Sequence, residues 1–456
     1  MKDNEANVVI CGAGLAGVSA AYFLSVRHGI RDVLLIDERP PLSLTSDHST
    51  ECYRNWWPGP DGAMAAFMNR SIDLLEELAE QSANVFHLNR RGYLYCTGSE
   101  AGLESFQKEA EMVSSLGAGP LRVHPTAGGS AYTPASSEGF AGQPEGADLI
   151  LDPDLIRSHF PYLSDQVRAA LHVRRAGWLS AQQLGMFFLE QARRGGVRLV
   201  SGSVTGVDCS SHGVEAVRLQ DGALIRAGRF VIASGPFLKE TGHLLGLDLP
   251  VYNELHLKAA IKDSLGVLDR NAPLVIWSDP QSLSWAEEER AYLAEDESTL
   301  PLLSILPSGV HARPEGGPGS QMILVLWEYR TRISEPVFPL YEDPLYLEVA
   351  LRGLVKLVPG MQAYVERTPR PRLDGGYYTR TRENRPLICK LPVTGAYLIG
   401  GLSGFGVMAS CAAGELLASH IAEAKLPDYA PAFSLERYED PGYLQKLAGW
   451  GDSGQL

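Results

Sequence analysis

A strand, a glycine-rich turn and a helix within residues 8–27 constrain the fold of this chain more than any other feature. Gly12, Gly14 and Gly17 follow the pattern G-x-G-x-x-G, and a second apolar strand ends at Asp37. The first glycine permits a tight turn, the second lets the backbone approach a pyrophosphate, and the third lets the helix pack closely against the strand. A carboxylate at Asp37 can bind a ribose 2′-hydroxyl and disfavours a 2′-phosphate. The pattern therefore predicts a βαβ unit that binds FAD or NAD rather than NADP.

The composition narrows the possible functions. The 456 residues exceed what one compact core usually holds, which predicts two domains. A net charge of −14 leaves no basic excess for phosphates, so we expect no nucleic-acid partner. The six cysteines form no CxxC pair, which predicts a reducing compartment and no metal site. Without a signal-peptide pattern or an apolar run of about 18 residues, we expect a cytoplasmic protein with no membrane span.

Periodic patterns predict alternating helices and strands along the rest of the chain. Residues 250–365 favour strands, with charged interruptions, and residues 117–146 are so rich in Gly, Ala, Ser and Pro that we expect a long mobile loop or insertion. Elsewhere the spacing predicts helices at 63–81, 180–194 and 409–424, strands at 91–96, 197–200, 229–235 and 396–401, and a hairpin-like stretch at 204–228.

Four sequence blocks occur in the order found in one enzyme family. They are GAGLAGVSAAYFLS with LLIDERPP; LILDPDLIRSHFPYL followed by GWLS; VTGV, a hairpin and FVIASGPF; and YYTRTRENRPLI followed by AYLIGGLSGFGVMASCAAGELLASHI. Over residues 7–425 the chain resembles the D-amino-acid oxidase-like FAD-dependent oxidoreductases, in particular the branch with glycine oxidase, sarcosine oxidase and dimethylglycine dehydrogenase. The resemblance implies FAD, rather than NAD, as the cofactor.

The resemblance also implies the fold class and the domains. We expect an α/β fold, α+β overall, in which a Rossmann-like FAD-binding domain is interleaved with a mainly antiparallel-sheet substrate domain. The FAD-binding domain would comprise residues 1–85, 148–248 and 368–430. The substrate domain would comprise residues 86–147 and 249–367, and a peripheral C-terminal tail would comprise residues 431–456.

Residues of the four blocks are implied to hold FAD. The glycine turn would approach the pyrophosphate, the end of the second strand would bind the ribose, and the turn before the last long helix would approach the flavin ring. The residues expected to bind the cofactor are Gly12, Ala13, Gly14, Leu15, Ala16, Gly17, Asp37, Glu38, Arg39, Ser46, His48, Ser49, Thr50, Val204, Ser234, Gly235, Gly401, Gly404, Phe405, Gly406, Val407 and Met408.

The loop after the second strand carries His48, eleven residues beyond Asp37. In the dimethylglycine/sarcosine dehydrogenase branch, a histidine at this place is linked covalently to the flavin 8α-methyl group within a Ser-Thr-x-His pattern. Here Ser46-Asp47-His48 keeps the spacing but only part of the pattern. Three interpretations stay open: covalent linkage to FAD, noncovalent packing beside the flavin, and a surface histidine.

Arg54, in the same loop, is the residue that the resemblance connects to substrate. Sarcosine oxidases bind the amino-acid carboxylate with an arginine in this region, and a guanidinium suits a carboxylate well. The alternative is an ion pair with Glu51 or Asp61. The family's second carboxylate ligand is a lysine, but Met408 stands in its place here. A simple carboxylate clamp is therefore incomplete.

A predicted strand, NELHLKAAIKD, adds further candidates. Glu254, His256 and Lys258 alternate with apolar residues, so in a strand they share one face and can line the substrate site or a solvated surface. Tyr377, before the last strands, is a further candidate for the pocket. Trp56 and Trp57 can stack on an alkylated amine or plug the space between domains.

These features together predict an FAD-dependent amine or amino-acid oxidase or dehydrogenase. It would oxidise a C–N bond of a sarcosine-like or glycine-like secondary or tertiary amine, by hydride transfer to flavin N5. Oxygen or an electron-transfer partner would reoxidise the flavin. The alternatives are an FAD-dependent 2-hydroxy-acid dehydrogenase, which would need a histidine base at His48 or His256, and a noncatalytic flavoprotein partner with a blocked pocket.

Overall fold

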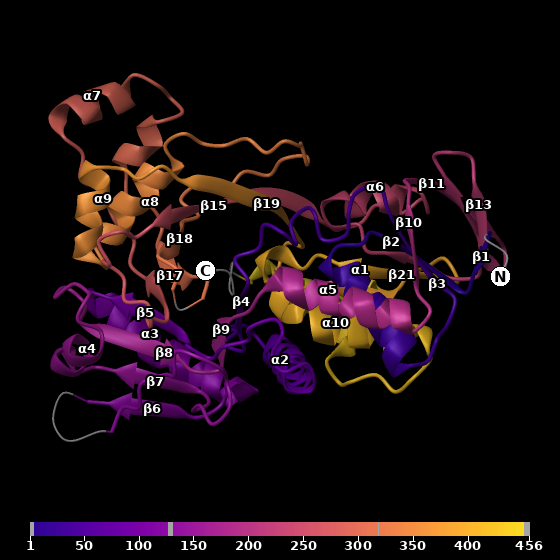
Figure 1. Cartoon of the computed structure of the whole chain (residues 1–456), viewed down its shortest axis with the longest axis horizontal. Helices are drawn as coiled ribbons and strands as arrows, with labels where there is room; N and C mark the ends of the chain where they lie inside the picture. Colours follow the sequence, from indigo (N-terminus) through magenta and orange to yellow (C-terminus); the bar gives the residue numbers. More distant parts are fainter. Residues whose placement is uncertain (1–3, 126–130, 318, 451–456) are drawn as a thin grey trace.

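The computed structural model describes residues 4–125, 131–317 and 319–450, which form a mixed α/β fold. Figure 1 shows a mostly parallel six-stranded sheet on its right side and a mostly antiparallel nine-stranded sheet on its left side. The two-stranded sheet of β4 (Cys52–Arg54) and β9 (Ala176–Trp178) lies between them. The predicted combination of a parallel and an antiparallel part is confirmed.

The six-stranded sheet contains the predicted βαβ unit. Its strand order is β10-β3-β2-β14-β21-β20, and all neighbours are parallel except β20 and β21. Apolar runs such as VVIC and VLLID form the central strands because both faces of the sheet are covered. The strands are β2 (Val8–Cys11), β3 (Val33–Asp37), β10 (Arg198–Ser201), β14 (Phe230–Ile232), β20 (Leu387–Lys390) and β21 (Ala396–Gly400).

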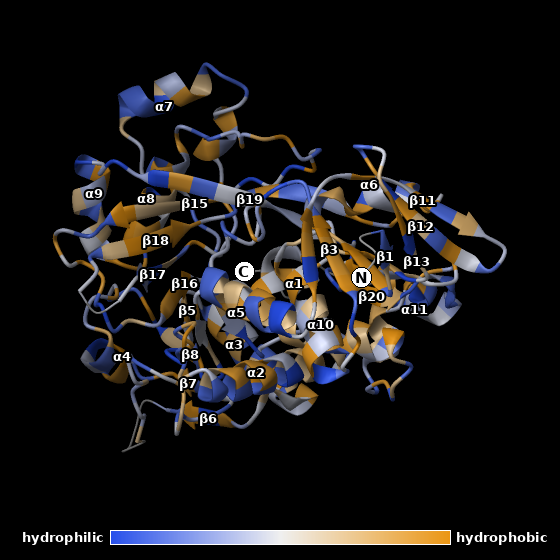
Figure 2. Ribbon diagram, turned by 45° about the vertical axis from the view of Figure 1, so that its right-hand side comes forward, coloured by the Kyte–Doolittle hydropathy of each residue, from blue (hydrophilic) through white to orange (hydrophobic). Residues whose placement is uncertain are grey.

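The two faces of this sheet pack against different layers. Val8 and Ile10 face the helices, whereas Val9 faces a four-stranded sheet, because successive side chains of a strand point to opposite faces. Figure 2 shows hydrophobic strands near α1 and α5. The helices are α1 (Leu15–Tyr22) with a π-helical turn at Phe23–Arg27, α2 (Ala63–Gln81), α5 (Ala181–Arg194) and α10 (Gly406–Ile421); the four-stranded sheet is β1 (Glu5–Ala6), β13 (Leu224–Ala227), β12 (Gly213–Leu219) and β11 (Val204–Ser210).

The nine-stranded sheet forms the second large core. All its pairings are antiparallel except β16–β5 and β6–β7. In order, its strands are β19 (Arg372–Arg380), β15 (Tyr252–Lys262), β18 (Met322–Leu326), β17 (His311–Glu315), β16 (Leu274–Trp277), β5 (Tyr93–Thr97), β8 (Ala169–Val173), β7 (Ala147–Ile150) and β6 (Leu121–His124). One core includes α4 (Pro153–His159), α7 (Glu287–Ala294), α8 (Tyr346–Val355) and α9 (Gln362–Glu366), and another includes α3 (Glu100–Val113).

The long strands β15 and β19 connect the two halves (Figure 1). β19 contacts the short 3₁₀ turns Gly235–Phe237 and Ser403–Phe405, which follow β14 and β21. The turn at Gly235–Phe237 leads into α6 (Leu238–His243). One end of the antiparallel sheet is thereby held beside the ends of the parallel strands. Among the described residues, no helix is both long and apolar enough to cross a membrane.

Two stretches differ from the sequence-based expectation. Within residues 117–146, the described part includes β6 and the buried Tyr132, whose hydroxyl lies 2.7 Å from His172 Nδ1; residues 126–130 lie outside the described part. A buried aromatic residue and a strand pairing therefore order a segment that its composition alone would assign to a loop.

The second stretch, residues 250–365, contains α7, α8 and α9 besides strands. In α8, the buried Leu347, Leu351 and Leu354 follow helical spacing, which the prediction missed.

The domain boundaries stay a prediction, but the sheet pairings bear on where they fall. β7 and β8 lie almost wholly within the expected FAD-binding range 148–248, but they pair with strands of the nine-stranded sheet.

The expected tail, residues 431–456, contains a buried ion pair. Arg437 Nε lies 2.9 Å from Glu383 Oε1, and both side chains are almost completely inaccessible to solvent.

This ion pair fastens the turn between β19 and β20. Arg437 also donates hydrogen bonds to the carbonyl oxygens of Arg385 (3.1 Å) and Pro386 (2.8 Å). Burial favours the neutral form of Glu383, but the Arg437 guanidinium outweighs it and holds the pKa of that carboxyl below its usual value. The last short helix, α11 (Pro441–Ala448), follows. The described part of the tail is therefore a structural element rather than a peripheral segment.

We expect Arg437→Ala to lower the free energy of unfolding by about 3 kcal/mol or more, because removing one partner leaves Glu383 as a buried unpaired charge. Chemical denaturation followed by tryptophan fluorescence measures this change. The exposed Arg367 provides a control, and Arg367→Ala should change the free energy by less than about 0.5 kcal/mol. A loss below about 1 kcal/mol for Arg437→Ala would mean that the tail contributes no more than a surface contact does.

Candidate active site

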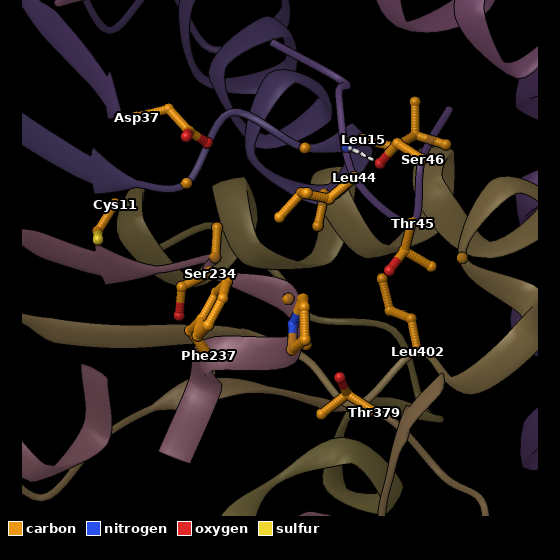
Figure 3. Close-up of a pocket in the computed structure, with 18 of the residues that line it drawn as sticks. Cys11, Leu15, Asp37, Leu44, Thr45, Ser46, Ser234, Phe237, Thr379 and Leu402 are labelled. Atoms are coloured by element: carbon orange, nitrogen blue, oxygen red, sulfur yellow. Dashed lines mark hydrogen bonds between the residues drawn. The ribbon is translucent and has the colours of Figure 1, made fainter. Parts of the chain in front are cut away.

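A cavity of about 440 Å³ lies at the carboxyl ends of the parallel strands. Cys11 ends β2, Asp37 ends β3, and Ser234 follows β14, and all three line this first cavity (Figure 3). β3 and β14 lie on opposite sides of β2, and ligands of open α/β sheets bind where the chain order reverses in this way. The volume is in the range of small-molecule and cofactor sites.

The glycine turn has the geometry that the sequence predicts. Gly12 has a φ of +109°, and a Cβ there would lie 2.4 Å from the carbonyl oxygen of Ala233. Asp37 Oδ2 accepts a hydrogen bond from the Ala13 N–H at 2.7 Å, and its Oδ1 accepts one from the Arg39 N–H at 2.9 Å. The carboxylate therefore fixes the turn and also lines the cavity.

Two helix N-termini meet the first cavity. α1 begins after Gly14, and its first amide, Leu15 N–H, donates to Ser46 Oγ at 2.9 Å (Figure 3). α10 begins at Gly406, with no side-chain cap and no acidic residue in its first turn. Helix N-termini carry partial positive charge and favour anions. The long cavity, the glycine turn and these two N-termini fit a dinucleotide.

Most of the residues predicted to bind the cofactor line the first cavity. Ala13 and Gly17 lie behind its wall, and His48 lines neither cavity. The predicted residues that line the first cavity are Gly12, Gly14, Leu15, Ala16, Asp37, Glu38, Arg39, Ser46, Ser49, Val204, Ser234, Gly235, Gly401, Gly404, Gly406 and Val407. The prediction missed other lining residues, among them Leu44, Thr45, Phe237, Thr379 and Leu402.

A second cavity of about 50 Å³ adjoins the first, since Tyr378 and Gly404 line both. Three residues predicted to bind cofactor, Thr50, Phe405 and Met408, line this smaller cavity instead. Gly404 lies close to the ring of Tyr378, and a Cβ at Gly404 would come within 2.4 Å of the ring carbon Cε2. The backbone at Gly404 and the Tyr378 ring therefore form the boundary between the two cavities.

Arg54 provides a buried cation in the second cavity. Its Nε donates to the Trp56 carbonyl oxygen at 3.1 Å, and its guanidinium carbon lies 4.9 Å from the ring centroid of Trp57 and 5.6 Å from that of Tyr93. The two acids proposed as alternative partners are bound elsewhere: Glu51 lies beside Arg313 and Asp61 pairs with Arg385.

The two tryptophans of the loop have different environments. Trp57 lines the second cavity and packs edge-on against Phe405, with ring centroids 5.0 Å apart. Trp56 is buried and does not line it. One of the two tryptophans thus faces the cavity, while the other packs into the core around β5 and α3.

His256 is a buried imidazolium held between two carboxylates. Its Nδ1 lies 2.6 Å from Glu328 Oε1 and its Nε2 lies 3.4 Å from Glu254 Oε2, while its ring stacks on Tyr378 at 3.8 Å. Burial opposes the charged form, but Glu328 and Glu254 outweigh it and raise the pKa of His256 to about 9. Arg380 lies 3.2 Å from Glu254. His256 is therefore charged at neutral pH.

His311 lines the same cavity in the opposite protonation state. Its Nδ1 lies 2.7 Å from the carbonyl oxygen of Gly309, which can only accept, so Nδ1 carries the proton. Burial lowers the pKa of His311 below its ordinary value. One small cavity thus contains a charged and a neutral histidine.

His48, Lys258 and Tyr377 do not line the second cavity. His48 Nδ1 lies 2.6 Å from Asp374 Oδ1, and Lys258 Nζ donates to the Ser49 carbonyl oxygen at 2.7 Å. Tyr377 lines the first cavity and donates to the Val337 carbonyl oxygen at 3.1 Å. His48 and Lys258 thus hold the loop that covers the first cavity. Their predicted roles toward flavin or substrate stay predictions.

Several polar residues of the second cavity were not among the predicted candidates. Glu328 lies two residues beyond the apolar strand MILVL, and a charged residue so close to the end of a buried strand is a signal that sequence reasoning could have used. Tyr93 and His311 carry no such signal, because only the pairing of distant strands brings them to Arg54. Tyr378, next to the chosen Tyr377, is the residue that reaches both cavities.

A cavity with a dinucleotide-binding glycine turn beside a small polar cavity is the arrangement of a cofactor-dependent oxidoreductase. The family model described as "FAD dependent oxidoreductase" (DAO) matches residues 7–420. The chain belongs to this family, and FAD is the cofactor that the family implies. The predicted resemblance is confirmed.

Individual relatives agree with this assignment. The chain is 26% identical to mitochondrial dimethylglycine dehydrogenase of Rattus norvegicus over 56% of its length, but spans only 26% of that protein. It is 21% identical to sarcosine oxidase subunit beta of Arthrobacter sp, covering 95% of this chain and 91% of that subunit. The crystal structure of L-proline dehydrogenase from P. horikoshii has the same fold, with a TM-score of 0.72, 19% identity, and coverage of 96% and 98% of the two chains.

We expect His256 to stabilise the fold within a defined pH window. Because its pKa rises from 6.5 to about 9 on folding, the contribution is complete below pH 6.5 and is lost as the pH rises through about 9. The urea midpoint of the wild type should therefore fall between about pH 7 and about pH 10, and fall less in His256→Gln. The exposed His212 supplies the control His212→Gln, which should keep the wild-type pH dependence. Parallel pH profiles for wild type and His256→Gln would contradict this assignment.

Proposed function

We propose that this chain is an FAD-dependent enzyme that oxidises the C–N bond of a small N-substituted amino acid. The observation that carries the proposal is a buried cation, Arg54, in a cavity of about 50 Å³ that adjoins the first cavity. A guanidinium is the side chain best suited to bind a carboxylate. The small volume favours a small substrate.

The first cavity would hold FAD. The glycine turn and the α1 N-terminus would hold the pyrophosphate, Asp37 the ribose, and the turn at Gly401–Gly406 with the α10 N-terminus the flavin. Bound FAD supplies the hydride acceptor for the C–H bond next to the substrate nitrogen. The oxidised product is an imine, which water hydrolyses.

The charges of the second cavity favour an amino acid bound as a monoanion. Arg54 and His256 each carry one positive charge, and Glu328 carries one negative charge. The lining therefore has an excess of one positive charge, which matches a carboxylate whose amine is neutral. A neutral amine is also the form from which a hydride can leave.

Tyr93 can supply the second carboxylate ligand. Met408 occupies the position of the family's lysine and lines the second cavity with its thioether side chain. Tyr93 lines the same cavity, and its hydroxyl is enclosed beside the Cys52 thiol, a weak hydrogen-bonding group, so the hydroxyl would have to turn toward the cavity to bind a carboxylate. Among the described residues it has no stronger partner. A neutral donor beside Arg54 would complete the carboxylate site without a second buried cation.

Two observations bear on the alternative functions. A 2-hydroxy-acid dehydrogenase was expected to use His48 or His256 as a base, but His48 lies outside both cavities and His256 holds its proton at neutral pH. A noncatalytic partner was expected to have a blocked pocket, whereas the described residues leave a cavity of about 50 Å³ beside the first. The neutral His311 of the second cavity could serve as the base of a hydroxy-acid dehydrogenase in place of His48 and His256, so the substrate panel below has to separate amine oxidation from hydroxy-acid oxidation.

The decisive experiment is anaerobic mixing of the flavin-loaded protein with a panel of substrates while the flavin absorbance is followed. The panel would contain N-alkyl amino acids, primary D- and L-amino acids, and 2-hydroxy acids. Reduction by N-alkyl amino acids would support the proposal. Reduction only by hydroxy acids, or by none of the compounds, would refute it.

We expect Arg54→Gln to lower kcat/KM for the N-alkyl amino acid by about a hundredfold, because a charge-assisted carboxylate contact contributes on the order of 3 kcal/mol. The flavin content of the purified protein should stay unchanged, since Arg54 does not line the first cavity. The exposed Arg290 on α7 provides the control, and Arg290→Gln should behave as wild type. A fall of less than about threefold for Arg54→Gln would exclude Arg54 as the carboxylate ligand.

A further inference from the structure

The second cavity contains two histidines whose surroundings fix opposite protonation states. His256 lies between Glu254 and Glu328 and holds two protons, one on each ring nitrogen. His311 lies at the start of β17, where the residues paired with it on the neighbouring strands, Leu326 of β18 and Ile276 of β16, are apolar. When the surroundings of two similar titratable groups in one site keep one protonated and the other unprotonated, the first can donate a proton or hydrogen bond and the second can accept one.

The tautomer of His311 is set by the backbone. Because the Gly309 carbonyl oxygen accepts the Nδ1 proton at 2.7 Å, the other ring nitrogen, Nε2, carries a lone pair. Within the described part of the chain, Nε2 has no hydrogen-bond partner, and it is not among the fully enclosed unpartnered atoms. His311 is itself buried, with only 5% of its surface exposed, and the cavity is the space that it lines. Nε2 is thus an acceptor available to a ligand.

Burial is the main reason why His311 is neutral. Arg54 of β4 and Arg313 of its own strand also lower the pKa of His311, whereas the hydrogen bond to Gly309 and the carboxylate of Glu328, two residues after β18, act in the opposite direction. His256, from β15, lines the same cavity and adds a further positive charge. Glu328 is already 2.6 Å from His256, so its negative charge is shared. His311 therefore presents a lone pair, and not a proton, to whatever occupies the cavity.

We propose that His311 Nε2 accepts a hydrogen bond from the N–H of the bound amine and so makes the enzyme selective for secondary amines over tertiary ones. The proposal rests on the amine oxidation proposed above. A neutral secondary amine has one N–H to donate, whereas a neutral tertiary amine has only a lone pair, which would face that of His311. A site with an acceptor for an N–H group discriminates against a ligand that lacks the N–H, because the buried acceptor atom of the protein is then left without a hydrogen bond.

Two isomers test the selectivity without a difference in size. N-ethylglycine and N,N-dimethylglycine have the same atoms, but only the first is a secondary amine. In steady-state turnover of the wild type with a dye as the electron acceptor, we expect kcat/KM to be at least about tenfold higher for N-ethylglycine. An equal or higher kcat/KM for N,N-dimethylglycine would overturn the proposal, and this outcome depends on no variant.

Two substitutions at His311 test the residue itself. Gln can place its amide oxygen near the position of Nε2, whereas Leu cannot accept a hydrogen bond. We expect His311→Leu to bring the ratio of kcat/KM for the two isomers to within about twofold of one, mainly by a loss with N-ethylglycine, and His311→Gln to keep part of the ratio. The exposed His212 provides the control His212→Leu, which should keep the wild-type ratio. An unchanged ratio in His311→Leu would overturn the proposal.

A binding measurement separates recognition of the nitrogen from general damage to the cavity. Propionate has the carboxylate but no nitrogen, so its dissociation constant, read from the perturbed flavin absorbance, should change by less than about twofold in His311→Leu. A large loss of propionate affinity would show that His311 shapes the cavity or binds the carboxylate instead, and would also overturn the proposal. If no amine reduces the wild type, the proposed function itself fails, which is distinct from amine oxidation without selectivity.

Discussion

The antiparallel pairing of β15 with β19 is the interaction on which the two cavities depend. The two strands pair from Tyr252 with Arg380 to Ala260 with Arg372 and connect the nine-stranded sheet to the ends of the parallel strands. In this register His256 and Tyr378 come together as a stacked pair facing the second cavity. Tyr378 also borders the first cavity. A slip of one residue would turn these side chains to the opposite face and separate the two cavities.

Buried charges in this chain are compensated locally, and the compensation determines what each site can do. His256 is charged because two carboxylates face it, and His311 is neutral because burial and nearby guanidinium groups oppose a second charge. Arg313, buried on β17, is matched by Glu315 and lies near Glu51. Arg54 lines the second cavity beside two aromatic rings. A guanidinium in this position suits a carboxylate ligand because it can form two parallel hydrogen bonds to the two carboxylate oxygens.

The part of the site that the sequence predicted well is the part set by local structure. The glycine spacing, the strand before it and the acid at Asp37 belong to one continuous βαβ unit, so their arrangement follows from neighbouring residues. The alternation in β15 correctly placed Glu254 and His256 on one side of the strand. The same alternation placed Lys258 on the face of the substrate site. Its long, flexible side chain instead reaches the Ser49 carbonyl oxygen, to which Nζ donates a hydrogen bond.

What the sequence did not reveal depends on tertiary pairing. His311 and Glu328 belong to β17 and the end of β18, and only the register of these strands with β15 brings them to Arg54, more than 250 residues earlier in the chain. The protonation state of a histidine likewise depends on neighbours that no local pattern specifies. Helix α8 was missed for another reason: apolar spacing was present, but it stood within a region dominated by strand patterns.

The close approach of Gly404 to the Tyr378 ring has a consequence for how this protein can change during evolution. A side chain at position 404 would collide with the ring and move a wall common to both cavities. A family member with an aromatic ring at position 378 thus requires glycine at position 404, while one with a smaller residue at 378 can accept alanine there. Among relatives, a side chain at position 404 should therefore occur together with a smaller residue at position 378, whereas glycine at position 404 fits either kind of residue there.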